Sequence, residues 1–207
     1  MLWIETGIAL PKATLVNEAK NANASVLHLP ALSVIDLHAE FSLKGFDAVF
    51  VASPRAAGIV CAQLKTCESD IYAIGESTAK AIEKEGIAVK QFGDGSGAET
   101  FIFSLKQNGV NLQNIAWLSA EETAADLPEI AQKFKIKIQH IAVYKTVPAI
   151  FSKEQIAKIE HPCKWILRSG KGVYAVQDLF KENDIFEPIG KSASDALKNF
   201  FATCLNT

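Results

Sequence analysis

Short apolar runs alternate with amphipathic stretches along the whole chain, and residues 71–89 show this pattern most clearly. The apolar run Ile71–Ile74 is followed by a glycine, an amphipathic segment and a second apolar run. A run of this length is typical of a buried strand, and Gly75 allows a sharp turn out of it. Ser77 or Thr78 is placed to cap the helix that follows. We therefore predict a strand, a tight turn, a capped helix and a second strand within this stretch.

The same alternation continues on both sides of this stretch. Further apolar runs predict strands at residues 2–4, 25–29, 46–51, 115–118, 165–167 and 185–189. Amphipathic segments between most of these runs predict helices. Strands that alternate with helices form parallel sheets, because each helix carries the chain back across the sheet. The sequence therefore predicts an α/β fold with parallel sheets.

Two extended segments, residues 31–36 and residues 135–147, differ from this alternation. The second alternates polar and apolar residues and is too long for an ordinary buried strand. We interpret it as a strand that closes one module and then returns as a connector beside residues 31–36. This interpretation gives a discontinuous first domain and an inserted second domain. The predicted limits are residues 1–30 plus 148–207 for the first domain, 37–142 for the second, and 31–36 and 143–147 for the linker strands.

The two halves of the chain share a spacing of strand-turn-helix segments. Ser53 and Gly75 follow two predicted strands and lie 22 residues apart, while Ser169 and Gly190 lie 21 residues apart in the second half. This spacing indicates an internal duplication. Turns at the carboxyl ends of parallel strands are where α/β proteins bind ligands, and helix starts favour anions.

Composition narrows the class of protein. The 207 residues are 49% hydrophobic and 21% charged, which is ordinary for a globular protein. The sequence has no run of eighteen apolar residues and no secretory signal at its start, so we expect a cytoplasmic protein without a membrane partner. A net charge of −2 argues against nucleic acid as a partner, since such binding needs many Lys and Arg residues.

The cysteines and histidines give no metal-site pattern. Cys61, Cys67, Cys163 and Cys204 are scattered without a CxxC pair, and the four histidines lack ligand spacing. Zinc sites usually need closely spaced ligands. We therefore expect reduced thiols, no disulfide and no metal.

Five motifs, in this order and spacing, resemble the uroporphyrinogen-III synthases, and the resemblance covers nearly the whole chain. They are FDAVFVASPRAA, IYAIGESTAKAIEKEGI, IAVYKTVP, WILRSGKGVYAV and IGKSASDAL. The resemblance implies two flavodoxin-like parallel-sheet domains joined by a two-stranded β-ladder linker, with the substrate between them. It also implies a monomeric, cofactor-free lyase of haem biosynthesis. That enzyme cyclises hydroxymethylbilane to uroporphyrinogen III, with loss of water and inversion of the last pyrrole ring.

The resemblance also implies roles for particular residues. Tyr144 matches the tyrosine of the family's return linker and becomes the expected proton donor. The substrate carries eight carboxylates, which helix starts and hydroxyls can hold. The expected carboxylate-binding residues are Ser53, Gly75, Ser77, Thr78, Ser169, Lys171 and Ser192. Cap preference alone also explains several of these serines and threonines, and Ser192 with Asp195 fits a capping box.

The chain departs from the family pattern at three turns. Ile4–Gly7 replaces an Arg-Pro turn, Ser119–Glu122 places carboxylates where a Gly/Arg-rich turn is usual, and Ala193 stands where Thr is common. A non-catalytic binder of tetrapyrroles or other polyanions is therefore an alternative function. A nucleotide-dependent enzyme is a third, because residues 93–98 fit a dinucleotide-binding pattern, although Asp94 would repel a pyrophosphate.

Overall fold

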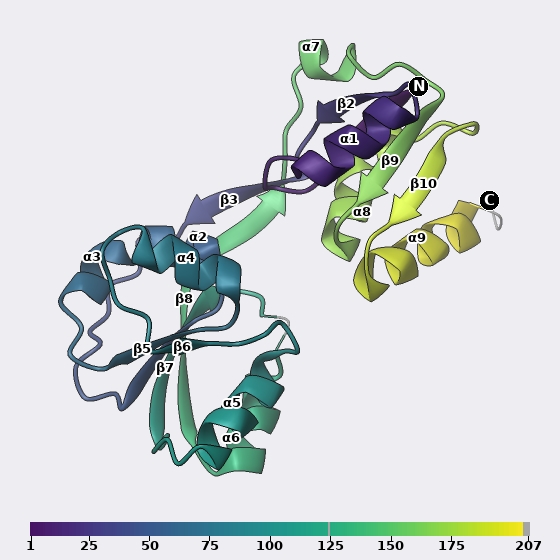
Figure 1. The fold of residues 1–207 in the computed structure, drawn as a ribbon. Helices are drawn as coiled ribbons and strands as arrows, with labels where there is room; N and C mark the ends of the chain where they lie inside the picture. Colours follow the sequence, from purple (N-terminus) through teal and green to yellow (C-terminus); the bar gives the residue numbers. More distant parts are fainter. Residues whose placement is uncertain (124, 205–207) are drawn as a thin grey trace. The chain divides into compact units, whose positions relative to one another are not determined.

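The computed structural model describes residues 1–123 and 125–204. The chain forms two compact units, which we call unit 1, residues 1–34 and 146–207, and unit 2, residues 35–145. Figure 1 shows that unit 2 is built from the middle of the chain and unit 1 from its two ends. Each unit contains a sheet with parallel strand pairs and covering helices, which confirms the predicted α/β fold class. Within the described residues, no helix combines the length and the apolar character needed to span a membrane.

Unit 2 is built on a six-stranded sheet with the order β3-β8-β7-β4-β5-β6. β4 pairs in parallel with β5 and β7, and β7 pairs in parallel with β8. The chain enters the unit along β3 and leaves it along β8, and these two strands are neighbours in the sheet. The strands are β3 Leu32–Asp36, β4 Ala48–Val51, β5 Asp70–Ala73, β6 Gln91–Phe92, β7 Asn114–Ala120 and β8 Lys137–Pro148. The helices are α2 Pro54–Ile59, α3 Cys61–Lys65, α4 Glu76–Glu83, α5 Ala98–Gln107 and α6 Leu127–Phe134.

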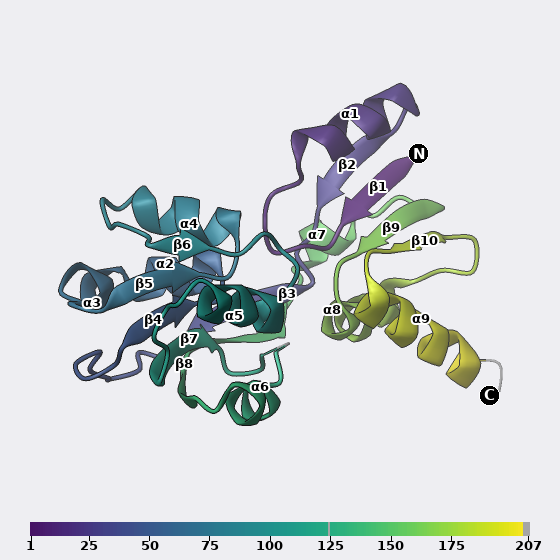
Figure 2. The same ribbon diagram turned by 60° about the horizontal axis from the view of Figure 1, so that its bottom comes forward.

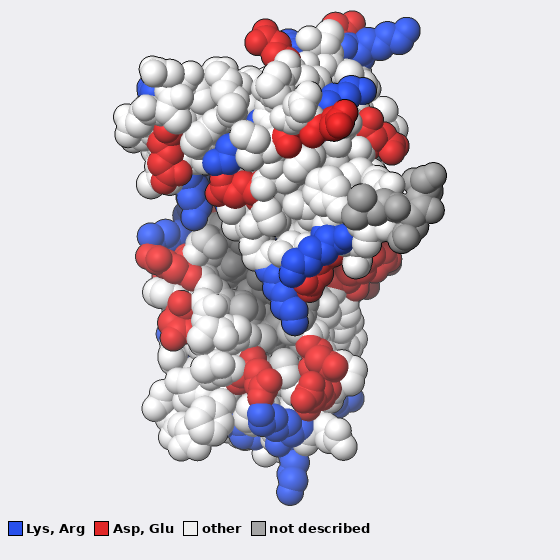
Figure 3. Space-filling view, turned by 90° about the vertical axis from the view of Figure 1, so that its right-hand side faces the viewer, with Lys and Arg blue, Asp and Glu red and all other residues white. Residues whose placement is uncertain are grey.

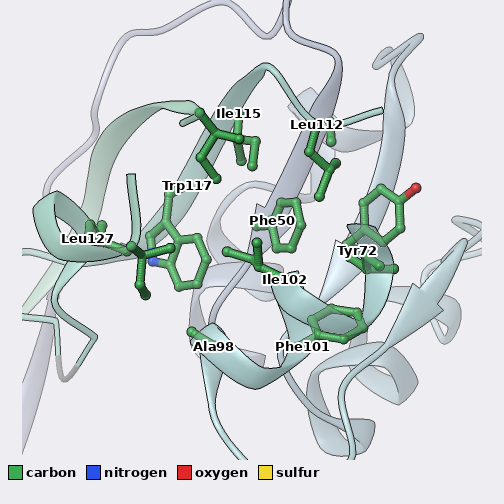
Figure 4. Packing of buried hydrophobic residues seen from close by; sticks show 13 residues of the cluster. Phe50, Tyr72, Ala98, Phe101, Ile102, Leu112, Ile115, Trp117 and Leu127 are labelled. Carbon is green, nitrogen blue, oxygen red and sulfur yellow. The ribbon is translucent and has the colours of Figure 1, made fainter. Parts of the chain in front are cut away.

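The central strands of unit 2 are apolar because helices cover both faces of the sheet. α2 and α4 lie on one face, and α5 and α6 lie on the other (Figure 1). All four residues of β4 are buried. Phe50 of β4 stacks on Tyr72 at 5.1 Å and on Trp117 at 5.7 Å between ring centroids, beside Phe101 and Ile102 of α5 (Figure 4). This aromatic layer fixes the strands whose carboxyl ends carry the candidate site.

Unit 1 has a four-stranded parallel sheet with the order β10-β9-β1-β2. α1 lies on one face of the sheet, and α8 and α9 lie on the other (Figure 2). Its core contains Trp165 of β9, whose ring contacts that of Phe180 at 5.1 Å. The strands are β1 Leu2–Glu5, β2 Ser25–His28, β9 Cys163–Leu167 and β10 Ile185–Pro188. The helices are α1 Ala13–Asn21, α7 Lys153–Ile156, α8 Gly170–Val176, the 3-10 turn η1 Gln177–Leu179 and α9 Lys191–Cys204.

Two details predicted for residues 71–89 are wrong. The N-cap of α4 is Gly75, so Ser77 and Thr78 lie inside the first turn and neither caps the helix. The second strand is β6, Gln91–Phe92, and residues 87–89 precede it. Both errors have a local cause. The helix begins directly after the extended glycine, and the apolar residue Ile87 is buried without joining the sheet.

Candidate active site

A hollow of about 330 Å³ opens in unit 2 where β4, β5 and β7 end. Its wall is mostly apolar and includes Ile74 and Trp117, while Ser53, Thr123 and Tyr144 contribute hydroxyls. Carboxyl ends of parallel strands are the usual ligand-binding edge of an α/β sheet. The position and lining of the hollow therefore make it the candidate active site of this unit.

Tyr144 and Ser53 meet at this hollow. The Tyr144 hydroxyl lies 3.0 Å from Ser53 Oγ, and Tyr144 is only 5% exposed. Ser53 is also the N-cap of α2, and its Oγ accepts a hydrogen bond from the Ala56 amide at 3.1 Å. The Ala56 amide occupies only a lone pair of the Ser53 oxygen, so the Ser53 hydroxyl proton remains available for donation to Tyr144. Tyr144 can then direct its own proton toward a group in the hollow.

A β-bulge aims Tyr144 at the strand ends. β7 and β8 are in regular register up to Ser119, which pairs with Ala142, but Ala120 pairs with Tyr144 and skips Val143. The bulge leaves Tyr144 opposite Ala120 at the end of β7, where its buried side chain lines the hollow. Bulges of this kind re-aim side chains beside active sites.

The turn after β7 is braced by a histidine. His140 Nε2 lies 2.8 Å from Ser119 Oγ and 3.0 Å from the Ala120 carbonyl oxygen. A carbonyl oxygen can only accept, so Nε2 carries the proton in this arrangement. The turn continues into Glu121 and Glu122, and Glu122 lines the hollow. The structure thus places a carboxylate beside the site.

The other residues of unit 2 that were expected to bind substrate carboxylates lie at the start of α4. Gly75 has an extended backbone and no side-chain cap, Ser77 is exposed, and Thr78 is 2% exposed. The lining of the hollow includes Ile74 but not these three residues. Ser53 and Tyr144 are therefore adjacent, while Gly75, Ser77 and Thr78 form a separate group.

The corresponding turns of unit 1 bring Ser169, Ser192 and Lys171 together. Ser169 is the N-cap of α8, and its Oγ accepts from the Gly172 amide at 3.0 Å. Ser192 Oγ accepts from the Gly170 amide at 3.1 Å, so it joins the starts of α8 and α9. α9 begins at Lys191, which places Ser192 within the helix, and its hydrogen bond with the Gly170 amide differs from that of a capping box. Lys171 and Ser192 line a shallow surface hollow together with Lys191 and Asp195.

An ion pair at the same edge of unit 1 escaped the sequence interpretation. Arg168 Nε donates to both carboxylate oxygens of Glu5, at 2.9 and 3.1 Å, although β1 and β9 are far apart in the sequence. Glu5 is 2% exposed, and its Oε1 also accepts from the Gly7 amide at 2.8 Å. The hydrogen bonds to Glu5 raise the pKa of the Arg168 guanidinium. The sign of this ion pair in the sequence is the charged residue Glu5 at the end of the otherwise apolar strand LWIE.

Trp117 is a second residue that sequence reasoning missed. Its ring packs beside Phe50 (Figure 4), lines the hollow and is 1% exposed. Its indole nitrogen makes no hydrogen bond within the described part of the chain. A buried N–H without a partner is uncommon in folded proteins. A tryptophan inside an apolar run gives no sequence sign of a polar role.

Comparisons with known proteins agree on one family. The family model described as "Uroporphyrinogen-III synthase HemD" matches residues 13–205. The chain resembles the uroporphyrinogen-III synthetase of Helicobacter pylori, with a TM-score of 0.71, 16% identity, and coverage of 96% of this chain and 88% of that one. A mutant uroporphyrinogen III synthase of the extremely thermophilic bacterium Thermus thermophilus gives a TM-score of 0.54 and 12% identity, with coverage of 97% and 89%. No curated protein sequence matches the chain significantly.

Proposed function

The chain belongs to the uroporphyrinogen-III synthase family, and from this premise we propose that Tyr144 is its proton donor and Ser53 the residue that positions it. The chain is accordingly a cofactor-independent lyase of haem biosynthesis that cyclises hydroxymethylbilane to uroporphyrinogen III, with loss of water and inversion of the last pyrrole ring. The observation that carries the proposed roles is the 3.0 Å contact between the two hydroxyls at the rim of the hollow.

The chemistry of the substrate supports a single donor. Its electron-rich pyrroles stabilise the cation that forms when the terminal hydroxyl departs, so the enzyme must supply a proton and hold the chain in a closing geometry. Tyr144 gives its proton to the departing hydroxyl, which leaves as water. The substituted carbon of the last pyrrole then bonds to the electrophilic carbon, and its bond to the neighbouring methylene bridge breaks. That methylene bonds instead to the free carbon of the same pyrrole, which inverts the ring. The free carbon loses its proton in this step, and this proton restores the tyrosine. Ser53 donates to the tyrosine oxygen throughout and stabilises its developing negative charge.

We assign the substrate carboxylates to the helix starts of both units. The binding residues are Gly75, Ser77 and Thr78 in unit 2 and Ser169, Lys171 and Ser192 in unit 1. Ser53, also expected from the sequence to bind a carboxylate, is assigned instead to Tyr144 because its one proton is donated there. The hydroxyls of Ser169 and Ser192 each accept a backbone N–H, and each therefore keeps one O–H to donate to a carboxylate. Helix N-termini favour negative groups, and Lys171 adds positive charge beside Ser192.

We further propose that the protein works as a monomer in the cytoplasm, and that neither nucleic acid nor a membrane is its partner. The net charge of −2 supports this proposal. On the face drawn in Figure 3, basic and acidic side chains of the described residues are interspersed. Binding to a nucleic-acid backbone depends on concentrated positive charge.

The reaction is tested by product analysis. Purified protein is supplied with hydroxymethylbilane, and the uroporphyrin isomers are resolved after oxidation. We expect isomer III in excess of the isomer I that forms spontaneously. Isomer I alone would contradict the assigned reaction and would favour a non-catalytic binder of tetrapyrroles.

The role of Tyr144 is tested separately with Tyr144→Phe. We expect kcat to fall by roughly 100-fold or more, the usual contribution of a positioned proton donor. The free energy of unfolding should fall by only about 1 kcal/mol, because one hydrogen bond is lost. Tyr72→Phe is the matched control, since Tyr72 is a buried tyrosine of the same unit that does not line the hollow. A wild-type kcat for Tyr144→Phe would remove Tyr144 from its role.

A further inference from the structure

Three metal-ligating side chains of unit 1 meet at the amino end of β9. His161 Nδ1 lies 3.7 Å from Cys163 Sγ and 2.8 Å from Asp184 Oδ1, and Sγ lies 3.4 Å from the same Oδ1. The ligand atoms all lie within 4.8 Å of one another. This cluster is at the opposite end of β9 from Ser169, and the strand that separates them is roughly 13 Å long. It is therefore separate from the turns assigned to the substrate.

We propose that His161, Cys163 and Asp184 bind one zinc ion. Tetrahedral zinc with bonds of about 2.3 Å to sulfur and about 2.0 Å to nitrogen and oxygen places its sulfur about 3.5 Å from the other two ligands, and these two about 3.3 Å apart. The observed sulfur distances of 3.7 and 3.4 Å are close to this geometry. Only the His161–Asp184 distance must widen, by about 0.5 Å. The His161 side chain is 27% exposed, and it can make this small movement toward solvent.

The carboxylate is already fixed by outer-shell hydrogen bonds. Asp184 Oδ2 accepts from the Trp165 indole nitrogen and from the Lys181 amide, each at 2.9 Å. Oδ1 also accepts from the Cys163 amide at 3.0 Å. Trp165 is fully buried, so this support is rigid. Metal sites depend on such partners to orient their ligands.

The geometry favours a metal over a nucleophilic thiol. In a thiol–imidazole–carboxylate relay, the thiol and the carboxylate contact different nitrogens of the imidazole. Here Cys163 and Asp184 approach the same nitrogen of His161. Burial and the neighbouring Asp184 carboxylate also raise the pKa of Cys163 to about 12, which keeps the free thiol protonated at neutral pH. A relay is therefore absent from this cluster.

Zinc binding balances charge at this buried position. The Cys163 thiol loses one proton to solvent on binding, and the resulting thiolate and the Asp184 carboxylate together neutralise Zn²⁺. A neutral imidazole moves its proton from Nδ1 to the Nε2 atom, and a water molecule fills the fourth position beside the exposed ring. The ion would tie the start of β9 to the segment before β10.

The proposal is tested on the full-length protein after chelation. We expect one Zn²⁺ per chain in competition with a chromophoric chelator, and a higher thermal midpoint after zinc is restored. Co²⁺ should give a thiolate-to-cobalt charge-transfer band and the visible spectrum of a tetrahedral site. The Cys163→Ser variant should lose this band. His161→Gln should weaken zinc binding by about 100-fold or more. Loss of a residue that only supports a ligand costs up to about 100-fold, and His161 is proposed as a ligand itself.

Two controls keep the test decisive. Cys61→Ser and Cys67→Ser change cysteines that lie in unit 2, and both should retain the band and the affinity. His161 is exposed, so His161→Gln should keep its circular dichroism spectrum and report on binding alone. Failure of the chelated wild type to bind zinc, binding without the charge-transfer band, or unchanged affinity in His161→Gln would each overturn the proposal.

Discussion

Ser53 and Ser169 occupy the same local position in the two units, but among the described residues only Ser53 has a second side-chain partner. Both are N-caps with extended backbones, and each accepts an amide hydrogen bond from the residue three positions later. Ser53 also contacts the Tyr144 hydroxyl. Comparison of the two serines therefore separates the capping of a helix from the positioning of the proposed donor.

We predict that Ser53→Ala and Ser169→Ala each lower the free energy of unfolding by about 1 kcal/mol, the usual cost of a lost cap. Ser53→Ala should also lower kcat by about tenfold, because the hydrogen bond to Tyr144 is worth about 1 kcal/mol or slightly more. Ser169→Ala should raise KM and leave kcat unchanged, since Ser169 is assigned to substrate binding alone. Urea unfolding and steady-state kinetics check both expectations.

A double substitution provides the control for this comparison. Ser53→Ala added to Tyr144→Phe should lower kcat little further, because the partner of Ser53 is already gone. Ser169→Ala added to Tyr144→Phe should have the same effect on KM as it has alone. An additive loss of kcat in the first pair would show that Ser53 acts independently of Tyr144.

At the scale of elements, α2 and α8 have the same place after a central strand but different surroundings. A Cβ atom added to Gly170 of α8 would lie 2.9 Å from both the carbonyl oxygen and the Oγ atom of Ser192. A Cβ atom added to Gly58 of α2 meets no atom within 4 Å. The start of α9 packs directly against α8, and Gly170 is the residue that permits this approach.

We predict that Gly170→Ala destabilises the protein by about 1–3 kcal/mol, the range for overpacked positions. Gly58→Ala, the matched control, should stabilise it by about 0.5–1 kcal/mol because alanine is the better helix former. Denaturant midpoints of the two variants measure the difference. Equal effects of the same sign would contradict the assigned packing of α8 against α9.

The strand-turn-helix elements could be predicted from sequence because their signals are local. A short apolar run followed by a serine or glycine turn placed β4, β5, β9 and β10 correctly, although the start of α4 was wrong. The capping box at Ser152 and Gln155 was also missed. The resemblance directed attention to Tyr144, and the roles of the site residues stay predictions.

The pairs that depend on strand order could not be predicted in this way. Glu5 meets Arg168 because β1 pairs with β9, and the bulge at Val143 depends on the register of β7 and β8. His161 and Cys163 are separated by one residue, but Asp184 joins them only through the pairing of β9 with β10. Local sequence patterns carry no information on such neighbours.

At the scale of the whole molecule, unit 2 is a continuous segment with a core of its own. All buried residues of the aromatic core around Phe50 lie between residues 48 and 136. Just outside this segment, the entering and leaving strands are joined where the Ala149 amide donates to the Ala31 carbonyl oxygen at 2.9 Å. Unit 1, in contrast, needs both ends of the chain to form its sheet.

We predict that a fragment of residues 31–149 folds alone and unfolds cooperatively in urea, because it keeps the complete six-stranded sheet. A fragment of residues 37–149 lacks β3 and leaves β8 as an unpaired edge, so it should be less stable and more prone to aggregate. Circular dichroism and sedimentation of the two fragments check this. An unfolded 31–149 fragment would show that unit 2 depends on unit 1.

The sheet order of unit 1 also has a consequence for synthesis of the protein. β1 lies between β2 and β9, and β9 begins roughly 160 residues after β1 in the chain. At about 5–20 residues per second, the ribosome needs on the order of 10–30 s to make that partner. During this interval unit 2 can complete its own sheet, while the apolar edge of β1 that later pairs with β9 stays unpaired. The nascent amino-terminal segment is thus the part of the chain that most needs chaperone protection before translation ends.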